Sequence, residues 1–373
     1  MAGKVTYLEN GSDRSHRSGE TPGPGYGRGA VEMVKGHGHV NQMGMVPAVF
    51  RMATGYWASQ AIYVAAKLGI ADVLGEGSKS GDEIASATGS NSKSLARLTQ
   101  ALVALGVLAV DDDGRFHLTG IGAPLQTGVP GSMRSLILTF GEEHYWAWGN
   151  LIDSVKGDKP AFNEVYGLPL FEYLAQNSGA ARTFNAAMTD LTSQMALAVV
   201  LAYDFSGSRV VADIGGGHGV LLDSILRSNP STMGILFDSE LVIEGATHIG
   251  SDEVRDRRQD LSGDFFELVP QGADVYILKN VLHDWSDDQA VRILKNCRCA
   301  MDSQAKLLVI ETVLPLSDDP AFGSLLDLNM LVMSGGRERT KDEYCGLLEK
   351  SGFHLAQLIP TFAPVSILEA IPL

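Results

Sequence analysis

The sequence predicts an α/β fold, a doubly wound sheet with helices on both faces, preceded by a mostly helical N-terminal part. Three observations carry this prediction. Residues 209–238 combine a buried strand, a glycine-rich turn, a helix and a second buried strand. Strand-like apolar runs then alternate with helical patterns as far as residue 351. Nearer the N-terminus, two helical patterns precede a short hairpin pattern.

Length and composition limit the possible number of domains and the possible binding partners. The 373 residues allow two domains, and a hydrophobic content of 45% supports a substantial core. A net charge of −15 argues against a nucleic-acid partner, because affinity for phosphates rests on clustered Lys and Arg. The basic cluster at 255–258 is flanked by acids and is interpreted as a solvated helix or loop face. The three cysteines fit neither a zinc site nor a disulfide framework, and we find no signal peptide or membrane helix. We therefore expect a cytoplasmic protein.

The first part of the chain reads as an arm followed by a helix. Residues 1–40 are rich in Gly, Ser and charged residues, so we expect a disordered or loose arm. Its His37 and His39 are interpreted as exposed tail residues rather than a metal pair. A helix over 45–68 is apolar on most of its surface and must be buried, either in the chain's own core or by a second subunit.

Residues 41–125 are predicted to form a winged-helix domain. Helical patterns cover 80–88 and 92–105, and two short strands lie within 107–119. A winged helix can bind DNA, but the second helix carries only Lys93 and Arg97 as cations. Dimerisation is therefore the favoured role.

Residues 126–202 are mostly helical and rich in aromatic side chains. Such a stripe can be ordinary core, but its density before a cofactor domain favours an apolar pocket for a small molecule. The predicted lining residues are Phe140, Trp146, Phe184 and Met188.

The glycine-rich turn opens the predicted catalytic domain, residues 203–373. Asp213 precedes three alternate glycines, Gly215, Gly217 and Gly219, whereas a dinucleotide fingerprint would need glycine at Val220. An acid just before the turn suits a cationic sulfonium better than a pyrophosphate. The pattern therefore favours S-adenosylmethionine over NAD. The alternative is a glycine-rich turn that binds no ligand.

The remaining elements place polar residues at one edge of the sheet. Strands are predicted over 274–278 and 306–310, helices over 287–301, 324–333 and 341–351, and a closing antiparallel pair over the last twenty residues or so. Functional residues of such sheets lie at the carboxyl ends of the strands. Those following each strand in turn are Asp213, Asp238, Asp264, Lys279 with His283, and Glu311. We expect the Asp238 carboxylate to accept hydrogen bonds from ribose hydroxyls.

His283 is the sharpest catalytic candidate. A phenol has a pKa of about 10, so an imidazole with a pKa of about 6.5 can take its proton during attack on a methyl group. A carboxylate on the far ring nitrogen would orient the imidazole, and Glu311 and Glu338 are the candidates. Asp284 is expected to point towards the cofactor. A structural histidine is the alternative.

A metal site formed by His283, Asp284, Asp287 and Asp288 is a second interpretation. Asp287 and Asp288 begin a helix, and its dipole explains them better, so no metal is expected.

Five segments together resemble the caffeate/hydroxyindole-type class I O-methyltransferases, above all the bacterial natural-product members. They are VVADIGGGHG, GDFFELVP, DVYILKNVLHDWSDDQAVRILKNCR, LLVIETVLP and DLNMLVMSGGRERTKDEY. The resemblance covers about residues 46–373 and implies a Rossmann-like sheet of seven strands with the last antiparallel. It also implies a homodimer formed through the winged-helix region, S-adenosylmethionine as donor with S-adenosylhomocysteine as product, and a phenolic, polycyclic acceptor without metal.

The resemblance also assigns roles to matching residues. The cofactor residues it implies are Gly215, Gly217, Asp238, Asp264, Phe265 and Lys279. His283 matches the general base, and Glu311 and Glu338 match its orienting acids. Met188, Asn329 and Met333 match substrate-lining positions, although the chain is one residue shorter than the plant pattern between 327 and 337.

Two other functions stay open at this stage. Some relatives keep the fold and cofactor but catalyse decarboxylation, hydroxylation or pericyclic reactions. A winged-helix regulator that senses S-adenosylmethionine is the other, and the acidic balance speaks against it.

Overall fold

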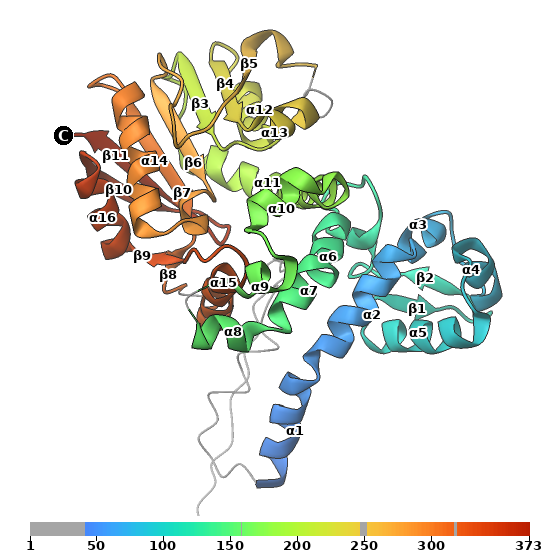
Figure 1. Cartoon of the computed structure of the whole chain (residues 1–373). Helices are drawn as coiled ribbons and strands as arrows, with labels where there is room; N and C mark the ends of the chain where they lie inside the picture. Colours follow the sequence, from blue (N-terminus) through green and yellow to red (C-terminus); the bar gives the residue numbers. More distant parts are fainter. Residues whose placement is uncertain (1–41, 158, 247–251, 317–318) are drawn as a thin grey trace, which may run out of the picture. The chain divides into compact units, whose positions relative to one another are not determined.

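The computed structural model describes the chain from residue 42 to its C-terminus, apart from 158, 247–251 and 317–318 (Figure 1). The predicted arm over 1–40, with its two histidines, lies outside the described residues. The chain divides into two compact units, residues 1–55 and 56–373. The finer predicted boundaries at 125 and 202 stay predictions. In the described part of the chain, no helix has both the length and the apolar character needed to cross a membrane.

The helix predicted over 45–68 is interrupted, so that prediction was wrong in one respect. Helices α1 (Gln42–Ala53) and α2 (Gly55–Lys67) flank Thr54, whose Oγ1 donates to the Phe50 carbonyl at 2.7 Å. Such local bonds from threonine compete with the helical ladder. Large apolar side chains stay exposed here, 65% for Val49 and 50% for Tyr56, so the described residues do not provide the burial that the pattern demands.

The winged helix forms as predicted. It comprises α3 (Ile70–Gly75), α4 (Gly81–Thr88), α5 (Ser92–Ala104), β1 (Leu108–Val110) and β2 (Phe116–Leu118). The two strands pair antiparallel, with Leu108 opposite Leu118. Ile84, Leu95 and Leu102 form its buried core. Ser80 and Glu83 form a capping box at the start of α4.

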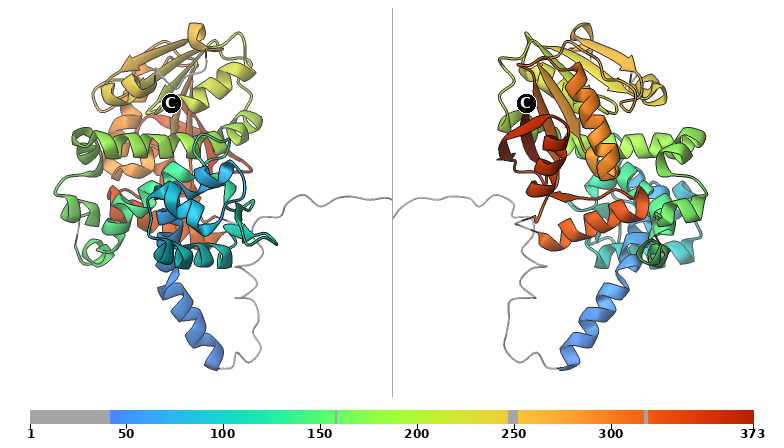
Figure 2. Two further views of the ribbon diagram at one scale, coloured as in Figure 1. Left: turned by 90° about the vertical axis from the view of Figure 1, so that its right-hand side faces the viewer. Right: turned by 60° about the vertical axis from the view of Figure 1, so that its left-hand side comes forward.

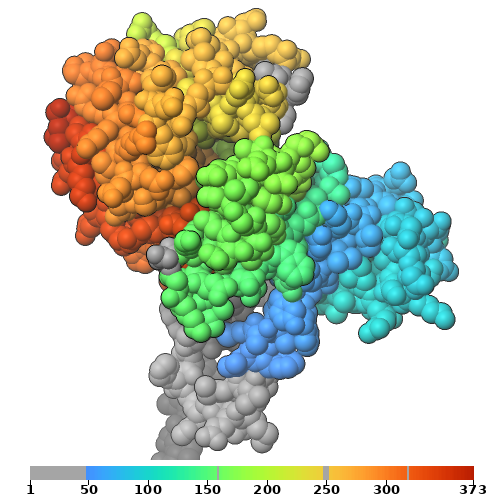
Figure 3. All heavy atoms as spheres, in the orientation of Figure 1, coloured from blue at the N-terminus to red at the C-terminus, as the bar shows by residue number. Residues whose placement is uncertain are grey.

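A helical section follows and ends in the longest helix. Its elements are η1 (Ala123–Leu125), α6 (Arg134–Gly141), α7 (Glu143–Trp148), α8 (Leu151–Lys156), α9 (Ala161–Tyr166), α10 (Leu170–Gln176) and α11 (Ser178–Ala202). The first part of α11 packs into a cluster around Phe162, through Ala181 and Phe184. Its last part packs on the sheet, through Ala196 and Val199. In Figure 3 the green helical section lies directly against the yellow and orange sheet region.

The sheet has seven strands, in the order β10-β11-β7-β6-β3-β4-β5. They are β3 (Val210–Ile214), β4 (Met233–Asp238), β5 (Arg258–Ser262), β6 (Val275–Lys279), β7 (Lys306–Glu311), β10 (Phe353–Pro360) and β11 (Ser366–Pro372). Strands β3 to β7 in this sheet are mutually parallel, and β11 runs antiparallel to β7 and β10. The predicted doubly wound sheet with an antiparallel last strand is confirmed.

Helices cover both faces of the sheet (Figures 1 and 2). On one face lie the end of α11 and α12 (Val220–Ser228), whose Leu221 and Ile225 contact the sheet core. On the other lie α14 (Asp287–Ala300) and α16 (Lys341–Lys350), which bury Ile293 and Leu347. The chain order reverses between β3 and β6, and ligands of open α/β sheets bind at such a switch point.

Shorter elements complete this unit. They are α13 (Glu240–Ala246), η2 (Arg255–Arg257), η3 (Leu282–Asp284), α15 (Pro320–Met333) and the two-stranded pair β8 (Val313–Leu314) and β9 (Arg339–Thr340). Strand β9 returns the chain from α15 to the edge of the sheet where β7 ends.

The basic cluster at 255–258 differs from its predicted solvated role. The Arg258 side chain is only 6% exposed, and its guanidinium donates to Asp223 on α12 and to Asp260 on β5, at 2.8 Å each. Arg257 donates to the carbonyl of Leu226 at 2.9 Å. The solvated interpretation fits Arg255, whose side chain is 64% exposed, but is wrong for Arg258.

Candidate active site

The glycine turn after β3 wraps around a buried acid. Gly215, Gly217 and Gly219 have φ values of 68°, 59° and 82°, the left-handed region that favours glycine. A Cβ at Gly216 would lie 2.7 Å from the carboxyl carbon of Asp213. The glycines therefore let the backbone fold closely over Asp213.

Asp213 offers an unused negative group at this turn. It is 1% exposed, and no hydrogen-bond partner for its Oδ1 exists among the described residues. Burial raises the pKa of Asp213 to about 7, against the opposing effect of the Lys279 amino group. Burial likewise lowers the pKa of Lys279, whose Nζ donates to Thr192 Oγ1 at 3.1 Å. A buried carboxylate with a free oxygen fits a cationic ligand.

Asp238 is held at the end of β4 by backbone amides. The amides of Gly217 and Ser239 donate to its two carboxylate oxygens at 2.8 and 2.7 Å. After β5, Asp264 is exposed and accepts the Phe266 amide at 2.8 Å. The structure thus places Asp213, Asp238 and Asp264 after three adjacent parallel strands.

Aromatic rings line up beyond these acids. Phe265 lies 6.1 Å from the ring of Trp285, edge to face. Trp285 in turn stacks on Phe171 of α10, with centroids 5.4 Å apart and planes 24° apart. The sequence singled out Phe265 through the family resemblance, but not the stack of Trp285 on Phe171, because the two rings come from segments far apart in the chain.

Helix α11 is tied to the glycine turn by contacts that the sequence did not predict. The Thr189 hydroxyl lies 2.8 Å from His218 Nδ1, in the turn itself. Burial lowers the pKa of His218, helped by the Arg258 charge, so the ring is neutral near pH 7. With the bond from Thr192 to Lys279, two neighbouring turns of α11 contact two different strand ends.

His283 meets both predicted acids. Its Nδ1 lies 2.9 Å from Glu338 Oε1 and 3.5 Å from Glu311 Oε2. His283 is 8% exposed, and the two acids are 1% and 0% exposed. Asp284, expected to point towards a cofactor, has its Oδ2 3.8 Å from the other ring nitrogen, Nε2. Two carboxylates thus converge on one imidazole nitrogen, leaving Nε2 for another partner.

The acids make the imidazole more basic. Burial by itself lowers the pKa of His283, but the charges of Glu311, Asp284 and Glu338 outweigh it and raise that pKa to about 10. Burial raises the pKa of Glu311 to about 7, with the His283 charge acting in the opposite direction. A histidine of this basicity matches the pKa of a phenol, about 10.

Arg339 fixes the loop that carries His283. Its side chain is fully buried and donates to the carbonyls of Leu282 and Trp285 at 2.8 Å each, and to Asp287 at 3.0 Å. The sequence analysis missed Arg339, because an arginine in a glycine-rich turn looks solvated. Asp287, assigned there to the helix dipole, also pairs with this guanidinium.

Hydrogen bonds between side chains and backbone amides position both acids. Glu311 Oε1 accepts the amides of Val281 and Leu282 at 3.0 and 2.8 Å, and Asp327 of α15 accepts the Glu338 amide at 2.9 Å. The acids are therefore fixed before any substrate arrives.

The four residues of the alternative metal interpretation do not form one cluster among the described residues. Within the described ranges, the group whose ligand atoms lie within 4.8 Å of one another is His283, Glu311 and Glu338. Asp288 is exposed, and Asp287 contacts Arg339. In the observed trio, His283 Nδ1 is bonded to Glu338, and a metal ion there would have to break that bond.

The predicted acceptor residues fall into two groups. Phe184 and Met333 belong to the cluster around Phe162, and Met188 lies on the same helix as Phe184. Asn329 Oδ1 accepts the indole N–H of Trp148 at 2.8 Å, which joins α15 to α7. Phe140 and Trp146 lie apart from this cluster and are 47% and 61% exposed.

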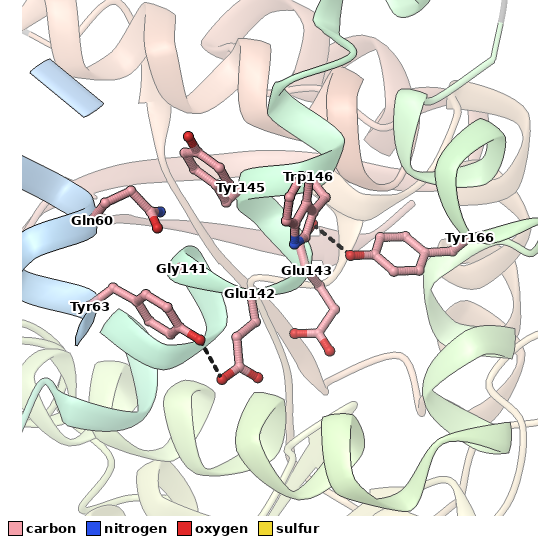
Figure 4. A pocket seen from close by; sticks show the side chains of 8 residues that line it. All are labelled: Gln60, Tyr63, Gly141, Glu142, Glu143, Tyr145, Trp146 and Tyr166. Carbon is pink, nitrogen blue, oxygen red and sulfur yellow. Dashed lines mark hydrogen bonds between the residues drawn. The ribbon is translucent and has the colours of Figure 1, made fainter. Parts of the chain in front are cut away.

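A cavity of about 410 Å³ opens beside Trp146 (Figure 4). Its lining residues come from α2, the junction of α6 and α7, and α9: Gln60, Tyr63, Gly141, Glu142, Glu143, Tyr145, Trp146 and Tyr166.

Comparison with known proteins shows what this arrangement belongs to. Residues 148–354 match the O-methyltransferase domain family, and residues 50–127 match the O-methyltransferase dimerisation domain. Phenazine O-methyltransferase PhzM of Lysobacter antibioticus is 44% identical, covering 89% of this chain and 99% of the relative. The 3-amino-4-hydroxybenzoate 4-O-methyltransferase of Streptomyces cremeus is 40% identical, covering 82% and 85%.

Solved structures of similar fold agree with the family match. The crystal structure of LaPhzM has a TM-score of 0.85 at 44% identity, over 88% of this chain and 99% of that one. The O-methyltransferase NcsB1 of neocarzinostatin biosynthesis, solved with S-adenosylmethionine and 2-hydroxy-5-methyl naphthoic acid, has a TM-score of 0.74 at 32% identity, over 85% and 96%.

Some relatives methylate nitrogen. The phenazine-1-carboxylate N-methyltransferase of Pseudomonas aeruginosa is 31% identical, over 83% of this chain and 92% of the relative. By the domain match and by these identities, the chain belongs to the O-methyltransferase family, whose enzymes depend on S-adenosylmethionine.

Proposed function

We propose that this protein methylates a phenolic hydroxyl of a fused aromatic secondary metabolite, with His283 as the general base. The observation that carries the proposal is the pair of buried acids, Glu311 and Glu338, on Nδ1 of a histidine at the rim of a methyltransferase sheet. Fixed acids of this kind set the tautomer and stabilise the imidazolium.

The residues at the glycine turn fit the methyl donor. Asp213 has a buried, unused carboxylate oxygen, and Asp238 is fixed where a ribose would need an acceptor. The residues proposed to hold S-adenosylmethionine are Asp213, Gly215, Gly217, Asp238, Asp264, Phe265, Lys279 and Asp284. When bound, it supplies an electrophilic methyl group.

The chain's own part in the reaction is to bind, align and deprotonate the acceptor. The free Nε2 of His283 takes the phenolic proton while Nδ1–H donates to Glu338. Alignment of the two reactants contributes a large share of the rate. Phe140, Trp146, Phe184, Met188, Asn329 and Met333 are proposed to line the acceptor site. No metal is needed for this route.

The proposed class of acceptor rests on the similar proteins. A phenazine enzyme and a naphthoic-acid complex stand among the similar proteins, so we propose two or three fused rings. A hydroxyphenazine is the first compound to try.

We also propose that the protein works as a homodimer. The dimerisation-domain match begins at residue 50, and apolar side chains there, such as Met52 at 81% exposed, await burial. A second copy provides it most directly.

The direct test is incubation of the full-length protein with 1-hydroxyphenazine and S-adenosylmethionine carrying a labelled methyl group. We expect a product heavier by one labelled methyl, placed on oxygen by NMR, and the same rate after dialysis against EDTA. A product methylated on nitrogen would show that the acceptor atom is nitrogen and not the proposed phenolic oxygen. A product without the label would indicate a repurposed reaction, and loss of the rate with EDTA would point to a metal.

Glu338→Gln should move the pH–rate profile towards acid. The Glu338 charge raises the pKa of His283, so its removal lowers that pKa, and the ring becomes free to accept a proton at lower pH. We expect the midpoint of the acid limb of the kcat profile to move to lower pH by about one unit or more. The plateau value of kcat should also decrease, because the base is weaker. The exposed Glu349→Gln provides the matched control. An unmoved limb in Glu338→Gln would contradict the assignment.

A further inference from the structure

The cavity beside Trp146 has aromatic walls and acidic groups. Tyr63, Tyr145, Trp146 and Tyr166 supply the rings. Trp146 is 61% exposed, so the cavity opens to solvent along an aromatic surface. Rings of this kind bind a flat aromatic molecule by stacking.

The two acids of the cavity differ in how their charge is balanced. Glu142 pairs with Lys67 and accepts the Tyr63 hydroxyl at 3.2 Å. Glu143 has no Lys, Arg or His nitrogen within ion-pair distance among the described residues; its backbone carbonyl accepts the Tyr166 hydroxyl at 3.4 Å. Figure 4 shows the two carboxylates pointing to the same side of the backbone.

No cation offsets this charge from the cavity wall. None of the described residues that line the cavity is a lysine, arginine or histidine. Burial raises the pKa of Glu143, and the neighbouring Glu142 charge adds to this, whereas the Lys67 charge and a backbone hydrogen bond act in the opposite direction. The Gln60 amide nitrogen, also on the wall, has no hydrogen-bond partner among the described residues.

The cavity and the cluster around Phe162 share one ring. Tyr166 lines the cavity and also packs on Phe162, with centroids 4.5 Å apart. The cluster around Phe162 contains Met333, at the end of α15, and the loop after α15 places the Arg337 amide on the His283 carbonyl at 2.8 Å.

From this arrangement we infer that the cavity is the outer part of the acceptor site, and that Glu143 selects against acceptors with a carboxylate. The favoured acceptors are fused aromatic phenols that are neutral, or that carry an amine or a ring N–H near this wall. A carboxylate on the acceptor would meet the like charge of Glu143, which has no ion-pair partner among the described residues, in a half-buried site. The inference rests on the proposed function and adds the charge class of the substrate.

The test compares two probes that differ only in charge, 6-hydroxyphenazine-1-carboxamide and 6-hydroxyphenazine-1-carboxylate, at pH 8. Binding is measured by calorimetry and turnover by product mass. We expect the wild type to prefer the carboxamide by about tenfold or more in Kd and in kcat/KM. In Glu143→Gln, the carboxylate should bind nearly as tightly as the carboxamide, so the preference for the carboxamide should disappear in both Kd and kcat/KM.

Glu164→Gln is the matched control, because it makes the same change at an exposed position of α9 outside the cavity. The preference of this control variant for the carboxamide over the carboxylate, in Kd and in kcat/KM, should equal that of the wild type. A wild type that binds both probes equally, or neither, overturns the inference, as does a ratio that Glu143→Gln leaves unchanged. Failure of methyl transfer with normal probe binding would count against the proposed function instead.

Discussion

His283→Ala should lower kcat by about 10³-fold while the affinity for S-adenosylmethionine stays within about twofold. The side chain bonds to Glu338 and lies beside Glu311 and Asp284, and none of these partners belongs to the glycine turn. Loss of the ring therefore removes the base and leaves the proposed donor contacts of the glycine turn in place. Steady-state kinetics and calorimetry measure the two quantities.

A companion variant separates chemistry from packing. Removal of the ring also leaves two buried acids without their partner, which can perturb the fold. His283→Gln keeps an amide donor for Glu338 but cannot take the proton, so it should be as inactive as the alanine variant and better folded. Appreciable turnover in either variant, or loss of donor binding in both, would refute the assigned role.

Arg339→Met should cost about 3 kcal/mol or more of unfolding free energy, together with much of the activity. The guanidinium is fully buried, and its loss leaves the carbonyls of Leu282 and Trp285 and the Asp287 carboxylate without their donor. Because these groups lie on either side of His283, the loop that carries the base should shift. Chemical denaturation gives the free energy, and kcat at a temperature where the variant is folded gives the functional loss.

Arg337→Met is the matched control two residues away. Arg337 pairs with Glu343 at the surface, and its side chain is 48% exposed, so the pair contributes at most about 1 kcal/mol. Equal stability losses in the two variants would show that the buried clamp has no special role.

Local pattern was enough for most of the fold. Glycine spacing, period and capping residues located β3, the turn and α14, where Ser286 forms the predicted cap with Gln289. The rim residues followed from the rule that strands of a parallel sheet end at a common edge. This rule grouped His283 with Glu311, whereas Glu338, 55 residues from His283, was matched through the family resemblance.

The structural features that the sequence analysis did not predict share a physical cause. Arg258 and Arg339 are buried by partners 35 and 52 residues away, and no local pattern distinguishes such an arginine from a solvated one. The break at Thr54 depends on one hydroxyl, and the stack of Trp285 on Phe171 depends on two segments meeting. Long-range pairing of polar and aromatic groups decided these positions.

The longest helix has a mechanical consequence. One helix of 25 residues carries Phe184 and Met188, which are proposed to contact the acceptor, and, within the next turn, Thr189 and Thr192, which contact His218 and Lys279 beside the proposed donor site. For the two proposed sites, a displacement of this helix by either reactant changes the fit of the other, so the two affinities are thermodynamically linked and reciprocal.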